Sequence, residues 1–365
     1  MRRSGPVSNP RGMPGNSGQF RPQQKPDVPD ANSRKERIVK PSRNLTDNPA
    51  ALQTLLLSTQ ASTGLTRRQI VHDYWLIRAL SGIAERLPAD GVFRAALTDK
   101  DTKKGRTEEM MPVKGLWAFG GGTSLTAAWK LSPRWSEDID ASIFQPKGSP
   151  KASFNTIRKK VTDMAAEAVG TKDETTGSAT IAHTVLVASD SLRFKMDHVL
   201  ETLSPEQVLG QRKAVAGLMA RYSDDPGGLC EEFPELGGFE LPVIEPAYIA
   251  VNKLDALHRR AATQRWEGLQ RRFRDIYDLY HISRLQPHAD LCRANVSQWW
   301  HRMNRDGGPA VDRPDGGYGN SPMFTTGSAA YDALADAYNN GINRIAIGQP
   351  PTFEEVITAA RTLDI

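Results

Sequence analysis

The stretch that decides the fold reads FGGGTSL over residues 119–125 and SEDID over residues 136–140. Glycines let a backbone approach a ligand closely, and a glycine turn that feeds a helix offers N–H groups to a phosphate. Asp138 and Asp140 lie two positions apart in an apolar run, so on a strand both carboxylates point to one face. They repel each other unless one is protonated or a cation lies between them, and oxygen ligands suit Mg²⁺. The stretch therefore predicts a metal and nucleotide site; the simpler alternative is a glycine-rich turn beside a solvated strand end.

Hydrophobic periodicity on both sides of this stretch predicts an α/β fold. Apolar residues recur at helical spacing over residues 65–87 and 154–169. We expect a short helix after the glycine turn at 124–130, and strands at 115–119, 135–144, 180–188 and 191–200. Further along, we expect residues 210–221 to be helical and residues 224–238 to form a loop.

A third carboxylate, Asp197, falls in the last of these strands. Strand alternation turns Asp197 and Lys195 away from the face that holds Phe194 and Met196, so Asp197 need not lie in the core. Its carboxylate is therefore available to a site on the surface of the sheet. The alternative is an acid at a strand edge that pairs with Lys195.

Two more motifs lie in a predicted helical C-terminal region. Pro246 begins a helix in which Lys253 lies on a mostly apolar face, where a lysine ordinarily extends its amine to solvent. The next helix, residues 271–280, has an apolar stripe with a basic flank and contains Asp275. We expect residues 304–328 to form a long loop, followed by helices at 329–339 and 353–363.

The first two motifs resemble the signature of polymerase-beta-like nucleotidyltransferases, in which a glycine-rich turn precedes an Asp-x-Asp or Asp-x-Glu pair. Thirteen residues separate Ser124 from Asp138 here. The full set of motifs is similar to the AbiEii/AbiGii-type toxin nucleotidyltransferases of toxin-antitoxin and phage-defence systems, among them the MenT-like toxins. The matching segments are GGTSL at 121–125, Arg134, SEDID at 136–140, VNKLDAL at 251–257 and RDIYDL at 274–279.

This resemblance implies a fold and a role for each matched residue. The implied fold is α/β (α+β), with a small mixed sheet flanked by helices and a mainly helical C-terminal region. The residues implied to bind the nucleotide are Gly121, Gly122, Thr123, Ser124, Arg134 and Ser136. Asp138 and Asp140 would bind Mg²⁺, with Mn²⁺ as a substitute, and Asp197 would act as base or second-metal ligand. Lys253 and Asp275 would complete the catalytic site; we carry the active-site role to Asp275 and not to Asp278.

The function implied is that of a Mg-dependent nucleotidyltransferase toxin. It would transfer a nucleoside monophosphate from an NTP to the 3′ end of tRNA and so block translation, with a cognate antitoxin protein as partner. Two alternatives stay open at this point. The first is transfer of a nucleotide or phosphate to a protein or small molecule, and the second is a non-catalytic regulator that binds NTP or RNA.

Charge is distributed unevenly along the 365 residues. The formal net charge is +5, but residues 1–45 hold ten Lys or Arg against three acids, which leaves 37 basic and 39 acidic residues elsewhere. We predict a disordered basic tail at 1–45, a nucleotidyltransferase core at 46–240 and a helical domain at 241–365. Cys230 and Cys292 show no metal-ligand spacing, and no apolar run is long enough for a bilayer. We therefore expect a cytoplasmic protein without structural zinc or membrane contact.

Overall fold

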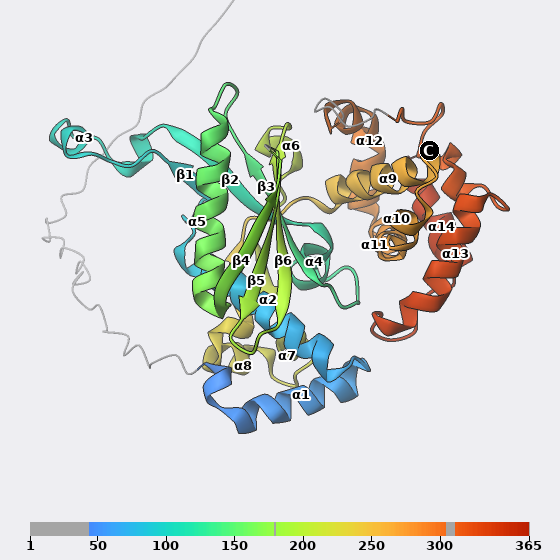
Figure 1. Ribbon diagram of the computed structural model, residues 1–365, viewed down its shortest axis with the longest axis horizontal. Coiled ribbons are helices and arrows are strands. Elements are labelled where there is room, and N and C mark those ends of the chain that lie inside the picture. Colours follow the sequence, from blue (N-terminus) through green and yellow to red (C-terminus); the bar gives the residue numbers. More distant parts are fainter. Residues whose placement is uncertain (1–43, 179, 304–310, 365) are drawn as a thin grey trace, which may run out of the picture. The chain divides into compact units, whose positions relative to one another are not determined.

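A mixed sheet places the two acid-bearing strands side by side. The computed structural model describes residues 44–178, 180–303 and 311–364. The strand order is β1-β2-β3-β6-β5-β4 (Figure 1). Their bounds are β1 Val92–Arg94, β2 Val113–Gly120, β3 Asp138–Phe144, β4 Gly170–Gly177, β5 Ile181–Ala188 and β6 Arg193–Glu201. β3 and β6 run parallel, whereas the other neighbours are antiparallel. This mixed sheet with its flanking helices confirms the predicted α/β fold.

Two long helices, α2 (Arg67–Arg86) and α5 (Lys151–Val169), pack against each other, and α5 also packs against β2, β4 and β5 of the sheet. Helix α2 begins with a capping box between Thr66 and Gln69, which satisfies backbone N–H groups at its start. A Cβ at Gly82 would overlap Ala168, so glycine lets the two helix backbones approach closely. Their apolar residues join those of the sheet in one core, and α1 (Pro49–Thr63) covers α2.

The C-terminal region is helical, and its apolar residues form a second core cluster. Its helices are α9 Pro246–Ala262, α10 Trp266–Gln270, α11 Phe273–Ser283, α12 Gln286–Met303, α13 Ala329–Gly341 and α14 Phe353–Arg361. Proline occupies the first turn of α9, where its missing N–H costs no hydrogen bond. The helices expected at 246, 271–280, 329–339 and 353–363 are therefore present. Within the expected loop, residues 304–310 lie outside the described residues, and Tyr318–Asn320 and Pro322–Phe324 form 3₁₀ turns.

The prediction for residues 210–238 was wrong in two places. The expected helix contains strand β7 (Lys213–Ala216) and only a short helix, α7 (Leu218–Arg221). The expected loop contains α8 (Pro226–Glu232) and the start of β8 (Gly237–Leu241), which pairs with β7 from Lys213 opposite Leu241. This pairing joins residues far apart in the chain, so local periodicity does not reveal it. Strand β4 was also missed because its residues are exposed and polar and show no apolar alternation.

Smaller differences concern element ends. Helix α4 (Gly121–Ala127) begins at the glycine turn, three residues before the expected start, and β3 begins at Asp138 rather than 135. Short helices α3 (Asp99–Lys103) and α6 (Pro205–Val208) complete the α-helices of the described residues. The predicted tail lies outside the described residues except for Asn44 and Leu45, and Leu45 is fully buried. The described residues form one compact unit, and no helix within them has the length and apolar character to cross a membrane.

Candidate active site

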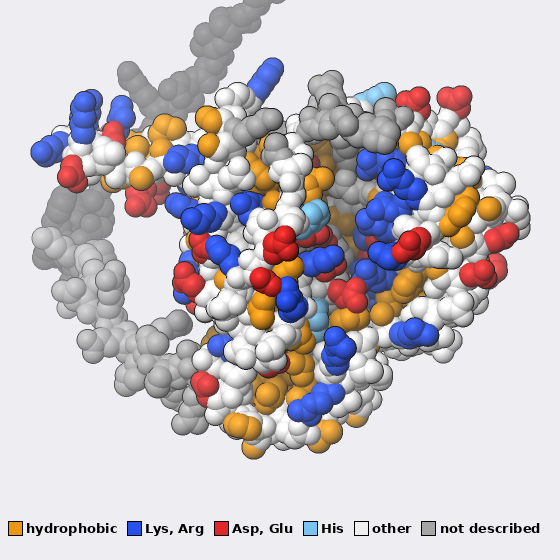
Figure 2. Space-filling view, in the orientation of Figure 1, with side chains coloured by type: hydrophobic (Ala, Val, Ile, Leu, Met, Phe, Trp, Pro, Cys, Tyr) orange, Lys and Arg blue, Asp and Glu red, His pale blue; other side chains and the backbone are white. Residues whose placement is uncertain are grey.

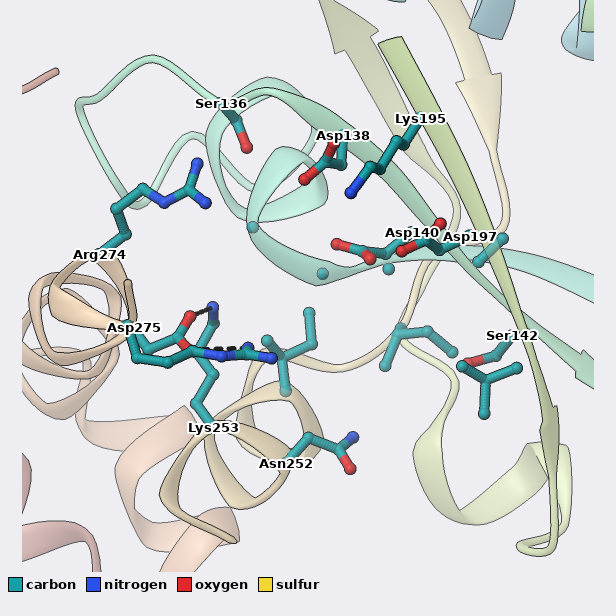
Figure 3. Close-up of a pocket in the computed structure, with 18 of the residues that line it drawn as sticks. Ser136, Asp138, Asp140, Ser142, Lys195, Asp197, Asn252, Lys253, Arg274 and Asp275 are labelled. Carbon is teal, nitrogen blue, oxygen red and sulfur yellow. Dashed lines mark hydrogen bonds and ion pairs between the residues drawn. The ribbon is translucent and has the colours of Figure 1, made fainter. Parts of the chain in front are cut away.

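Three carboxylates lie together on one face of the sheet, where β3 and β6 run side by side. In their parallel register Asp140 lies opposite Asp197, and Asp138 lies opposite Lys195. Ile139 packs into the core on the other face, so strand alternation turns the aspartates away from the core. Figure 3 shows the three carboxyl groups beside one another at the edge of a cavity.

Burial and mutual repulsion raise the pKa of two of these acids. Burial is the largest cause for Asp140, whose pKa rises from 3.8 to about 7, and the charges of Asp197 and Asp138 add to it. Burial also raises the pKa of Asp138, where Asp197 adds to the effect and the Arg274 guanidinium opposes it. A cluster of this kind gains stability from a proton or a cation between its oxygens.

The glycine turn fits closely over the same acids. Gly121 has φ 65°, in the left-handed region, and a Cβ there would overlap the Asp140 carboxyl group. A Cβ at Gly122 would overlap the Arg134 guanidinium. Gly121 therefore requires glycine both for its backbone conformation and for the space that a side chain would fill, and Gly122 requires it for space alone. As a result the turn's backbone forms part of the cavity wall, through Gly120, Gly121 and Gly122.

The hydroxyl groups of Thr123 and Ser124 hold this turn in place. Thr123 lies 2.9 Å from the Ser136 hydroxyl and donates to the carbonyl oxygen of Asp138. Ser124 donates to the carbonyl oxygen of Gly121 at 2.9 Å, and both side chains are buried. Ser136 lines the cavity, whereas Thr123 and Ser124 do not. The nucleotide contacts expected of all three residues stay a prediction.

Lys253 and Asp275 form a buried ion pair on the opposite wall, which α9 and α11 build. The Lys253 amine donates to Oδ1 of Asp275, and Arg272 donates to Oδ2 at 3.0 Å. Burial alone would lower the pKa of Lys253, but the carboxylates of Asp275 and Asp278 outweigh it and raise that pKa. Burial opposes the charge on Asp275, yet Lys253 and Arg272 hold its pKa below the usual value. Both members of the pair are therefore ionised, Lys253 as an ammonium and Asp275 as a carboxylate.

Sequence reasoning gave Asp278 no active-site role, but in the structure it contacts two residues of the predicted site, Arg134 and Lys253. It is 0% exposed and accepts hydrogen bonds from Nε and Nη2 of Arg134, each at 2.7 Å. Its Oδ2 also lies 3.0 Å from the Lys253 amine. The signal was present in the sequence, because Asp275 and Asp278 are three positions apart and share a helix face. Arg134, predicted to contact phosphate, has its three guanidinium nitrogens engaged by Asp278 and the carbonyl oxygen of Trp135.

A cavity of about 700 Å³ lies between the acidic and the basic wall. The sequence anticipated Lys253 and the basic flank of the helix at 271–280, and the structure adds Arg260 of α9 to this wall. Lys and Arg side chains form a column on the side of the helical region that faces the sheet (Figure 2). Lys195 lies on β6 beside the acids, and the cationic residues of the basic wall are Lys253, Arg260, Arg271, Arg272 and Arg274. This wall suits a polyanionic ligand.

Asp197 pairs with a residue that the sequence did not suggest. Nδ1 of His183, on the neighbouring strand β5, lies 2.9 Å from Oδ1 of Asp197. The alternative partner, Lys195, points toward Asp138 instead (Figure 3). His183 lies directly opposite Asp197 in the antiparallel register, so the pairing follows from the sheet.

The donor set fits a hard cation that retains other ligands. Asp138 and Asp140 provide oxygens at the cavity, and burial together with repulsion from Asp197 raises the pKa of both, as expected for clustered carboxyl groups without a counter-charge between them. Within the described ranges, no three His, Cys, Asp or Glu side chains are already arranged as a metal cluster. Mg²⁺ commonly binds through one or two carboxylates together with water and substrate phosphates, so this set is compatible with it.

The mixed sheet, the glycine turn and the Asp-x-Asp strand together define the class of nucleotidyltransferase folds. A family model described as the nucleotidyl transferase AbiEii toxin of type IV toxin-antitoxin systems matches residues 111–359, more than half of the chain. The chain belongs to this family, which confirms the resemblance drawn from its motifs. No curated protein matches the chain. Among solved structures, the nucleotidyltransferase toxin MenT4 from Mycobacterium tuberculosis is 16% identical, with 86% of this chain and 99% of that chain covered and a TM-score of 0.37.

Proposed function

We propose that this protein is a nucleotidyltransferase toxin that transfers a nucleoside monophosphate from an NTP to the 3′ end of tRNA in the cytoplasm. The observation that carries the proposal is the pairing of two walls across one cavity. Asp138, Asp140 and Asp197 line one wall, and Lys253 and four arginines line the other. An NTP needs both, because its phosphates bind cations, whereas carboxylates would hold the metal ion at the reacting phosphate and accept the proton of the attacking hydroxyl.

Each wall has its own task in the proposed reaction. The backbone of Gly121 and Gly122, with the Ser136 hydroxyl, binds and orients the triphosphate. Lys253 and Arg272 stabilise the negative charge that develops on the leaving pyrophosphate. Asp275 and Asp278 hold the Lys253 amine in position through contacts at the base of the wall. Asp197 lies where it can accept the proton of the attacking hydroxyl.

Asp138 and Asp140 would hold Mg²⁺, or Mn²⁺ in its place. When bound, such an ion neutralises phosphate charge and lowers the pKa of the attacking hydroxyl. The proposed product is an acceptor extended by one or more nucleotides, with pyrophosphate released. Extension of a tRNA 3′ end would prevent aminoacylation and stop translation, and the family description implies a cognate antitoxin that restrains this activity.

The proposal is tested by incubating the protein with each labelled NTP, Mg²⁺ and total tRNA. We expect label on tRNA with the wild type and a loss on the order of a hundredfold or more with Asp138→Ala. The matched control is Asp336→Asn, an exposed carboxylate on α13, which should behave as the wild type. Absence of transfer by the wild type, or equal transfer by Asp138→Ala, would contradict the proposal.

Two further measurements in the same reactions separate the alternatives. Intact-mass analysis of the protein and of added small molecules detects nucleotide or phosphate transfer to an acceptor other than RNA. Equilibrium NTP binding without any transfer would instead indicate a non-catalytic regulator. The first result, together with no label on tRNA, would replace tRNA as the acceptor in this proposal. The second would contradict nucleotide transfer altogether.

A further inference from the structure

The residues that line the cavity differ in chemical character between its two ends, and they differ in the same direction on both walls. On β6, the residues that line the cavity run from Lys195 and Asp197 to Val199 and Glu201. On α9, the residues that line the cavity run from Tyr248 and Asn252 to Lys253 and Arg260. One end is therefore rich in arginine. We call the other the tyrosine end, and it comprises Ser142, Val199, Glu201, Tyr248 and Asn252.

Hydrogen bonds close the cavity at the tyrosine end. The Tyr248 hydroxyl donates to Oε2 of Glu201 at 2.7 Å, and Ser142 donates to Oε1 at 2.8 Å. These contacts join α9 to β6 and β3, so the helix wall meets the sheet wall. Hydrogen-bonded side chains from both walls therefore bound this end of the cavity.

Two side chains at this end are open to a ligand. Asn252 is exposed on α9, and its amide can both donate and accept hydrogen bonds. Val199 is 37% exposed, although its neighbours Ile244 and Ile249 on the cavity wall are buried. Binding pockets for small molecules combine such apolar surface with a few polar groups that fix orientation. Figure 3 shows Asn252 and Ser142 on the side of the cavity away from Ser136 and Arg274.

We propose that the tyrosine end binds the sugar and base of the incoming nucleotide, with Asn252 as the hydrogen-bonding residue and Val199 against the uncharged face of the ligand. The assignment rests on the proposed function and deepens it. An NTP is anionic at one end and uncharged at the other, and the cavity has the same polarity along both walls. With phosphates toward the arginines and the reacting phosphorus at Asp138 and Asp140, the nucleoside extends toward Ser142, two residues further along β3.

The test compares the binding of each NTP with that of inorganic tripolyphosphate, which has the charge but no nucleoside. In the wild type at least one NTP should bind more tightly than tripolyphosphate. Asn252→Ala should weaken NTP binding about threefold to tenfold, the effect of one hydrogen bond, and leave tripolyphosphate binding unchanged. Val199→Ala should weaken the binding of the same NTP by a smaller factor. Asn339→Ala, an exposed asparagine near the end of α13, is the matched control.

Three results would overturn the assignment. If Asn252→Ala weakens the binding of NTP and of tripolyphosphate equally, or weakens the binding of neither, the nucleoside lies elsewhere. The proposed function stands in that case. If Asn252→Ala leaves NTP binding intact and weakens tRNA binding, the tyrosine end belongs to the acceptor. If the wild type binds neither NTP nor tripolyphosphate, the proposed function fails and this subsite fails with it.

Discussion

Asp278 of α11 holds Arg134 by two parallel hydrogen bonds of 2.7 Å, although the two residues are 144 positions apart in the chain. Asp278 is 0% exposed and Arg134 is 3% exposed, so the pair is removed from water. The Arg134 guanidinium lies against Gly122, and Asp278 also contacts Lys253. One carboxylate thereby connects the glycine turn of the sheet region to the lysine of the helical region.

Removal of the Asp278 charge should destabilise the protein strongly. In Asp278→Asn, the Arg134 guanidinium loses its carboxylate and remains buried, which in comparable cases costs about 3–5 kcal/mol. Chemical denaturation of the purified protein measures the change in the free energy of unfolding. Asp336→Asn provides the control for the same substitution at an exposed site. A change below about 1 kcal/mol, the range of an exposed ion pair, would contradict a structural role for the pair.

Gly121→Ala should impair both stability and activity. Alanine in the left-handed region costs about 1–2 kcal/mol, and at this position its Cβ would also displace the Asp140 carboxyl group. Gly105→Ala is the matched control, because Gly105 has φ 71° but open space around its Cα. We expect Gly105→Ala to show the conformational cost alone, with unchanged nucleotide transfer. Equal effects of the two variants would mean that the overlap with Asp140 is unimportant.

Lys253→Ala should lower kcat/KM for nucleotide transfer by about 10²–10³, the loss typical of one charge-stabilising group. The control is Lys159→Ala, an exposed lysine on α5. Because the variant leaves Asp275 and Asp278 buried without their shared cation, its folding is checked by circular dichroism and thermal unfolding. A folded Lys253→Ala protein with wild-type kcat/KM would show that this wall does not act in the reaction.

The buried carboxyl group of Asp73 lies away from the active site, and we expect it to make the stability of the fold depend on pH. Burial raises its pKa from 3.8 to about 6, although the backbone N–H of Leu218 opposes the shift. A carboxyl group with a raised folded-state pKa stabilises the fold in its protonated form, so its contribution is present below pH 4 and is lost as pH rises through 6. The contribution is on the order of 3 kcal/mol.

The free energy of unfolding should be measured between pH 4 and 7.5 for the wild type and Asp73→Asn. We expect the difference between wild type and variant to fall as pH rises, since asparagine does not titrate. A constant difference across this range would show that Asp73 keeps its ordinary pKa in the folded protein.

The predictions that held for the fold came from local patterns. Alternation in β3 and β6 turned Asp138, Asp140 and Asp197 to one face, and helical spacing located α2, α5, α9 and α11. The failures lie where structure depends on distant partners. Strand β7 forms because β8 pairs with it, and β4 forms at the exposed edge of β5 with no apolar pattern of its own.

The sequence by itself determined the chemical inventory of this protein: a glycine turn, three aspartates on one sheet face, and Lys253 with Asp275 in a family of nucleotidyl transferase toxins. Only the tertiary structure decided which charged side chains contact one another. It paired Asp197 with His183, gave Asp278 both Arg134 and Lys253, and arranged the arginines opposite the acids. The physical reason is that periodicity along the chain specifies which face a side chain occupies. A charge, in contrast, finds its partner through proximity in space, which only the packing of distant elements creates.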